Sequence, residues 1–104
     1  MKSCITCSMP FEGNHANDIG LETSEGPICV HDVEEGKMKG PTEIFEGGVQ
    51  WYMGAVTNGV RDLAERLCRK NMNSLPYWQQ HPDPVLEGPQ ATEVEHAAAM
   101  ANIK

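Results

Sequence analysis

The sequence predicts a small α+β protein in three parts: a cysteine-bearing β unit over residues 1–40, two short helices over residues 41–78, and a weakly structured or helical tail over residues 79–104. Three observations support this division. Glycines and prolines interrupt the first forty residues so often that few helices can form there. Apolar residues then recur with helical spacing from Thr42 onwards. Prolines return after residue 80 among few apolar side chains, which is typical of a linker.

The composition is that of a small fold that needs support beyond its core. Only 39% of the 104 residues are hydrophobic, and the chain has two Phe, two Trp and two Tyr. We therefore expect a metal or a partner to contribute stability. The net charge of −7 opposes attraction to a phosphate backbone, which disfavours nucleic acid as a partner. No apolar stretch approaches the ~18 residues of a membrane span, and no signal-peptide pattern is visible, so we expect a cytoplasmic protein.

Within the first part, two stretches have the pattern of short antiparallel strands. Residues 19–23 and 27–30 lie on either side of a Ser-Glu-Gly turn sequence. A hairpin of these strands would bring Cys29 close to the turn between Cys4 and Cys7. The β unit is thus expected to gather three cysteines.

The cysteine spacing predicts a zinc ribbon. Cys4 and Cys7 form a C-x2-C turn, which can point two thiolates at one ion, and Cys29 is the natural third ligand. The fourth ligand is expected three positions later, at Asp32, although zinc also accepts the imidazole of the neighbouring His31. We predict a Zn²⁺ site of Cys4, Cys7, Cys29 and Asp32, with His31 as the alternative fourth ligand.

Other fates of the cysteines remain open at this point. The three could be free or form one disulfide, although a reducing compartment favours metal binding. A redox C-x-x-C is disfavoured, because the residues after Cys7 lack the pattern of a helix that would lower a thiol pKa. Cys68 lies on the apolar stripe of the second helix, so we predict a buried core thiol there.

The two helices follow from apolar periodicity. The first begins at Pro41-Thr42 and contains Gly47-Gly48, each of which weakens it by about 1 kcal/mol relative to Ala. We expect it to depend on packing, or on another backbone that approaches the glycines. Residues 57–59 are expected to break the chain and supply the N-cap of the second helix, which ends near residues 71–73. Residues 75–78 should then fold back onto both helices.

The tail combines a linker with a marginal helix. Residues 79–90 have linker composition, and residues 92–95 form a possible capping box. Val94, Ala97, Ala98 and Ala101 would share one face of the following helix. Because alanines bury little area, this helix should form only if it docks on something.

Three motifs of residues 1–78 match a known pattern: Cys4-Ile-Thr-Cys7-Ser-Met-Pro10, then Ile28-Cys29-Val-His-Asp32-Val33, and finally Leu75-Pro-Tyr-Trp78. In these motifs the chain resembles a family of small archaeal and bacterial zinc ribbon proteins. The resemblance implies a ribbon carried on a short helical segment, with zinc at Cys4, Cys7, Cys29 and Asp32. Two departures stand out, since Ser8 replaces the family's usual Gly and Asp32 replaces its last Cys.

The function that these features favour is a non-catalytic, zinc-stabilised interaction module, such as a protein-binding adaptor or regulator. No catalytic set of polar residues is visible, so we do not expect an enzyme. The partner would be another protein or a second copy of the chain. Aromatic residues are the candidate interface, as they are enriched at hot spots: Trp51, Tyr52, Tyr77 and Trp78.

Two alternative functions remain. A nucleic-acid-binding, transcription-associated ribbon would use the basic cluster of the second helix together with Lys37 and Lys39, although the net charge disfavours it. The basic cluster consists of Arg61, Arg66, Arg69 and Lys70. A zinc-dependent hydrolase would need Asp32 to swing away and leave an open metal position for water. Three thiolates would make zinc a poor Lewis acid, which ranks this alternative last.

Overall fold

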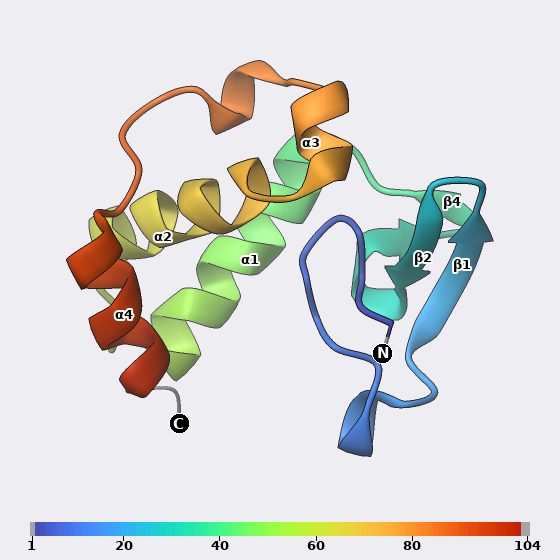
Figure 1. The fold of residues 1–104 in the computed structure, drawn as a ribbon, viewed down its shortest axis with the longest axis horizontal. Helices are drawn as coiled ribbons and strands as arrows, with labels where there is room; N and C mark the ends of the chain where they lie inside the picture. Colours follow the sequence, from blue (N-terminus) through green and yellow to red (C-terminus); the bar gives the residue numbers. More distant parts are fainter. Residues whose placement is uncertain (1, 103–104) are drawn as a thin grey trace.

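The structure, a computed structural model, describes residues 2–102. Two antiparallel hairpins come first, β1 (Ile19–Thr23) with β2 (Gly26–Cys29), and β3 (Val33–Glu34) with β4 (Lys37–Met38). The helices that follow are α1 (Pro41–Ala55), α2 (Arg61–Asn73), α3 (Pro76–Gln80) and α4 (Glu93–Ala101). The hairpins lie to one side of the helices (Figure 1). This arrangement confirms the small α+β fold.

The first hairpin is the one that the sequence predicts. Thr23 pairs with Gly26, so Ser24 and Glu25 form its two-residue loop, and Cys29 ends β2. The second hairpin was not predicted. Its loop residues Glu35 and Gly36 both have positive φ, 52° and 77°, a combination that a type I′ hairpin loop requires. A glutamate at the first of these positions is a weak signal, which explains the omission.

Helices α1 and α2 build the larger core. Their buried residues recur at helical spacing, as predicted: Ile44, Phe45, Val49 and Tyr52 on α1, and Ala64, Leu67, Cys68 and Met72 on α2. Cys68 is a free thiol with 2% exposure, which confirms its place in the core. The close approach expected at the glycine pair involves a side chain rather than a backbone. It occurs at Gly48, where an added Cβ would lie 2.7 Å from Cys68 Sγ.

The start of α2 differs from the prediction. Its N-cap is Val60, which provides no side-chain cap, and the expected cap at residues 57–59 is wrong. The hydroxyl of Thr57 instead donates to the Val60 carbonyl at 2.9 Å. Asn58 and Gly59 have positive φ, 54° and 89°, and turn the chain between the two helices.

The tail packs more closely than its composition suggests. Residues 79–90 include a 3₁₀ turn, η3 (Pro84–Leu86), and Leu86 is buried in the helical core. The capping box at the start of α4 is confirmed, with Thr92 and Glu95 bonding each other's backbone amides. The expected apolar face is wrong, because Val94 is 79% exposed and Ala99 is the buried residue of α4.

Two ion pairs join α4 to α2. Arg66 Nη1 lies 2.6 Å from Glu95 Oε1, and Lys70 Nζ lies 2.6 Å from Glu93 Oε1. Periodicity alone could not find this face, since its partners are charged.

No helix in the described part of the chain is long and apolar enough to cross a membrane.

Candidate metal centre

Four side chains predicted as ligands converge beside the first hairpin. Cys4 and Cys7 belong to the N-terminal loop, Cys29 ends β2, and Asp32 ends the 3₁₀ turn η2 (Val30–Asp32). One donor atom from each lies within 4.8 Å of the other three. Cys4 and Cys29 are fully buried, and Asp32 is 6% exposed. The group could hold a metal ion.

Two of the six distances between the donor atoms match the edges of a tetrahedral zinc site. Cys7 Sγ lies 3.6 Å from Cys29 Sγ, and Cys4 Sγ lies 3.6 Å from Asp32 Oδ2. With zinc bond lengths of about 2.3 Å to sulfur and 2.0 Å to oxygen, a tetrahedron has edges of about 3.8 Å between two sulfurs and about 3.5 Å between sulfur and oxygen. Both contacts are close to these edges.

The backbone of the N-terminal loop holds two of the cysteines in place. The Ser8 amide donates to the Cys4 carbonyl at 2.8 Å, and the Cys4 amide donates to the Met9 carbonyl at 2.8 Å. Ser8 has a φ of 67°, a conformation that glycine adopts without steric cost. The Cys29 amide also donates to Cys4 Sγ at 3.3 Å.

The side chains of the cluster shift one another's pKa values. Hydrogen bonds from the Cys29 and Cys7 side chains lower the pKa of the Cys4 thiol despite its burial. Hydrogen bonding with Cys29 and Cys4 raises the pKa of Cys7, and bonding with Cys4 raises that of Cys29 to about 12. Burial raises the pKa of Asp32. One thiolate is therefore favoured, and a divalent cation would stabilise the others.

His31, the alternative fourth ligand, is exposed and lies outside the group of four. The 3₁₀ conformation of η2 buries Asp32 and leaves its neighbour on the surface. His15, in the 3₁₀ turn η1 (Gly13–His15), lies within hydrogen-bonding distance of Asp18, with 2.8 Å between Nδ1 and Oδ2. The structure thus brings the three cysteines together with the carboxylate of Asp32 and not with the imidazole of His31.

Three residues that sequence reasoning missed hold the centre against the helices. The Thr6 hydroxyl donates to Asp32 Oδ2 at 2.6 Å, and the Trp78 indole donates to the Thr6 carbonyl at 3.0 Å. Asn71 of α2 donates to the Cys7 carbonyl at 3.1 Å. Thr6 had a local signal, as a hydroxyl residue inside the C-x2-C turn. Asn71 had none, because its contact spans 64 residues.

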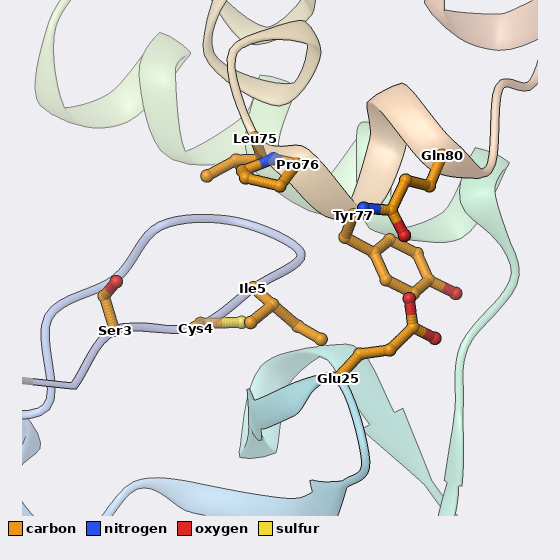
Figure 2. Close-up of a pocket in the computed structure, with 8 residues that line it drawn as sticks. All are labelled: Ser3, Cys4, Ile5, Glu25, Leu75, Pro76, Tyr77 and Gln80. Atoms are coloured by element: carbon orange, nitrogen blue, oxygen red, sulfur yellow. The ribbon is translucent and has the colours of Figure 1, made fainter.

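Two cavities border the centre. The larger, about 700 Å³, has Cys7, Cys29 and Asp32 in its wall, together with apolar side chains of α1 and α2 such as Trp51 and Met72. The smaller, about 310 Å³, lies between the N-terminal loop, the turn of the first hairpin and α3, with Cys4 at its base and Tyr77 and Glu25 at its side (Figure 2). The large cavity, called the cleft below, approaches the centre from the helical side.

The four aromatic residues proposed as an interface differ in accessibility. Trp51 is 50% exposed and lies on the wall of the cleft. Tyr77 is partly exposed at the small cavity. Tyr52 and Trp78 are buried, with 6% and 2% exposure, and belong to the helical core. Trp51 and Tyr77 are therefore the members of the set that a partner could contact directly.

Comparison with known proteins places this chain with none of them. No protein-family model matches it, and neither a curated protein nor a solved structure matches it. The resemblance to zinc ribbon proteins thus stays a prediction from its three motifs.

Proposed function

We propose that this chain is a zinc-stabilised, non-catalytic module that binds another protein through the cleft beside its metal centre. The convergence of three thiols and one carboxylate, with two of their contacts close to the edges of a tetrahedral site, is the observation that carries the proposal. Thiolate-rich sets select zinc among the abundant divalent ions, and a site with four protein ligands is typical of a structural role. An adaptor or regulator needs no more chemistry than this.

Zinc would supply stability that the small cores lack. The β half has a buried cluster of Cys4, Ile28 and Cys29, which is too small to hold two hairpins by itself. Metal binding to such a set adds its binding free energy to folding. The helices would then stay attached through Asn71 and Trp78, which bond to the metal-binding loop.

The metal part of the proposal is tested by native mass spectrometry. We expect one zinc ion per chain in the wild type, its loss in Cys29→Ser, and weaker retention in Asp32→Ala. Cys68→Ser is the matched control, because Cys68 is a buried cysteine outside the group of four. A wild-type protein purified with zinc available that carries no metal would overturn the proposal.

The interaction part is tested at Trp51, the exposed aromatic residue of the cleft wall. Cross-linking in cells and sedimentation of the purified protein would detect a foreign partner or a second copy. Trp51→Ala should weaken the complex without lowering the melting temperature. Val94→Ala is the control, since Val94 is 79% exposed but does not line the cleft. An unchanged complex in Trp51→Ala would contradict docking at the cleft, and a complex weakened only by Tyr77→Ala would place the contact at the small cavity instead.

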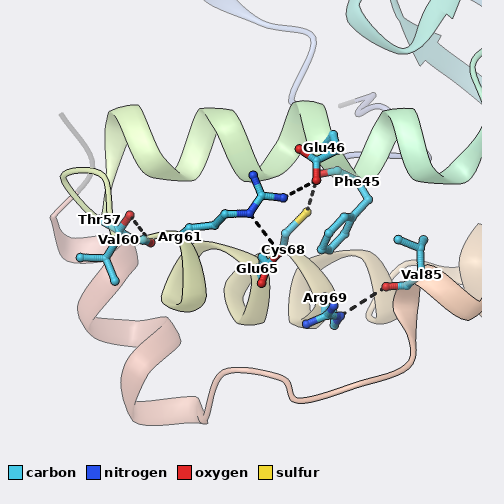
Figure 3. Close-up of polar contacts among 9 residues, drawn as sticks. All are labelled: Phe45, Glu46, Thr57, Val60, Arg61, Glu65, Cys68, Arg69 and Val85. Carbon is cyan, nitrogen blue, oxygen red and sulfur yellow. Dashed lines mark hydrogen bonds and ion pairs between the residues drawn. The ribbon is translucent and has the colours of Figure 1, made fainter.

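Nucleic acid is a weaker proposal, because the basic cluster of α2 is engaged within the molecule. Arg61 contacts Glu46 and Glu65, and Arg69 donates to the Val85 carbonyl while its guanidinium lies over the Phe45 ring (Figure 3). The other two basic residues of the cluster pair with acidic residues of α2 and α4. A salt titration checks this, since phosphate contacts make affinity fall steeply with salt.

A zinc-dependent hydrolase is the second candidate, and the cleft favours it, because three of the four possible ligands lie in its wall. Asp32 would have to leave the metal to admit water, yet it is buried and bonded to Thr6. Three thiolates would also reduce the Lewis acidity of the ion. Hydrolytic turnover that requires zinc and survives Asp32→Ala would establish this function instead.

A further inference from the structure

We propose that Thr6 is a positioning residue of the metal centre, whose hydroxyl holds the Asp32 carboxylate for ligation through one oxygen and thereby sets the affinity for zinc. The inference rests on the zinc site proposed above and concerns the one ligand that is not a cysteine. It assigns a role to a residue that lies between two ligands in the sequence and is not a ligand itself.

The contacts of Thr6 point to this role. Its side chain is fully buried, and its Oγ1 donates to Asp32 Oδ2 at 2.6 Å. Oδ2 is also the oxygen that lies 3.6 Å from Cys4 Sγ, close to the edge of a tetrahedral site. Thr6 Oγ1 lies 3.1 Å from Cys4 Sγ as well, but a hydroxyl has one proton to donate. The shorter contact identifies Asp32 as the acceptor.

A carboxylate needs such a contact more than a thiolate does. It has two oxygens and rotates about its terminal torsion, so it can bind an ion through one oxygen or both. Hard ions such as Ca²⁺ accept both, whereas tetrahedral zinc is completed by one. A hydrogen bond at Oδ2 restricts the rotation before the metal arrives. Partners of this kind typically change metal affinity about 10–100-fold.

Thr6 is itself held from the other side. Its backbone carbonyl accepts the indole N–H of Trp78 at 3.0 Å, and Trp78 is 2% exposed. Because this bond uses the main chain, a change of the Thr6 side chain leaves it intact. Thr6→Val removes the hydroxyl and keeps the shape, so the variant isolates the contact with Asp32.

The experiment measures zinc affinity by competition with a chromophoric chelator. We expect Thr6→Val to bind zinc about 10–100-fold more weakly than the wild type, and Thr6→Ser to recover most of the loss because it restores the hydroxyl. Thr6→Ala serves as the second hydroxyl-free variant if valine prevents folding, which circular dichroism with zinc present would reveal. An affinity of Thr6→Val equal to that of the wild type would overturn the inference.

A second parent protein, the Asp32→Cys variant, separates the effect of Thr6 on the position of the Asp32 carboxylate from its effect on packing. In Asp32→Cys the fourth ligand is a thiolate with one donor atom, so adding Thr6→Val should change zinc affinity little. In the Co²⁺-loaded protein, Thr6→Val should shift the d–d bands while the charge-transfer intensity of three thiolates is retained. An equal loss of affinity in the Asp32→Cys background would show that Thr6 acts through packing and refute the assignment. A wild type that binds no zinc would instead refute the underlying metal site.

Discussion

Gly48→Ala tests the packing of α1 on α2, and Gly47→Ala is its matched control. The two glycines are neighbours in the same helix, but only one faces α2. A Cβ at Gly48 would lie 2.7 Å from Cys68 Sγ, whereas a Cβ at Gly47 would meet nothing within 4 Å. The same substitution is therefore expected to stabilise the protein at Gly47 and not at Gly48.

The magnitude follows from two terms. Alanine favours the helix over glycine by about 1 kcal/mol at either position. At Gly48 the 2.7 Å approach is below any ordinary contact, and overpacking of a core costs about 1–3 kcal/mol. The sulfur has little room to move, because it lies 3.5 Å from the Phe45 carbonyl (Figure 3) and 3.7 Å from Met72 Sδ. Gly48→Ala should thus be less stable than Gly47→Ala by about 1–3 kcal/mol.

Urea denaturation monitored by tryptophan fluorescence would measure these differences, with zinc held in fixed excess because bound metal adds to stability. For a domain of this size, 1 kcal/mol also moves the melting temperature by about 4–8 °C. Adding Cys68→Ala should remove most of the penalty at Gly48 and leave the gain at Gly47 unchanged. The reasoning would be refuted if Gly48→Ala proved as stable as Gly47→Ala.

Three further predictions concern other contacts. Asn71→Ala should cost about 1–3 kcal/mol, because it removes the bonds to the Cys7 carbonyl and the Ser8 hydroxyl, and urea denaturation would measure the loss. Burial raises the pKa of Cys68 from 9.0 in the unfolded chain to about 12 in the folded protein. The contribution of the neutral thiol to the free energy of unfolding is therefore fully present below pH 9.0 and is lost as pH rises towards 12. Between pH 8 and 10.5 the wild type should therefore lose more stability than Cys68→Ala, and an equal loss would contradict this. Thr92→Ala should remove the cap of α4 at a cost of about 1 kcal/mol, visible as faster amide exchange in that helix and not in α1.

The elements that the sequence predicted well are those whose signals are local. The spacing of apolar residues in α1 and α2, the turn of the first hairpin and the capping box of α4 each depend on residues a few positions apart. The missed hairpin had a local signal too, but one of its two positive-φ residues is a glutamate. Signals between residues a few positions apart thus predicted most of the helices and strands, but they predicted few of the residues at which these elements begin and end.

The candidate metal site was likewise predicted in part from the sequence and decided in part by the structure. The C-x2-C spacing predicted Cys4, Cys7 and a third cysteine after a strand, and it favoured position 32 for the fourth ligand. The choice between Asp32 and His31 depended on the direction in which each side chain points from the 3₁₀ turn η2. The sequence pattern does not reveal this direction, because the two residues are adjacent. Only the path of the backbone decided it.

Tertiary structure alone decided what surrounds the site. The bonds of Asn71 and Trp78 to the N-terminal loop join residues 64 and 72 positions apart, and no periodicity relates such positions. The tertiary structure also decided that Gly48, rather than Gly47, lies against the Cys68 side chain. Likewise, it decided that α4 contacts the other helices through Ala99 and ion pairs rather than through Val94. The sequence by itself determined an α+β chain with a set of cysteines at metal-binding spacing. The support of that set depends on long-range packing, because it arises only when distant elements meet.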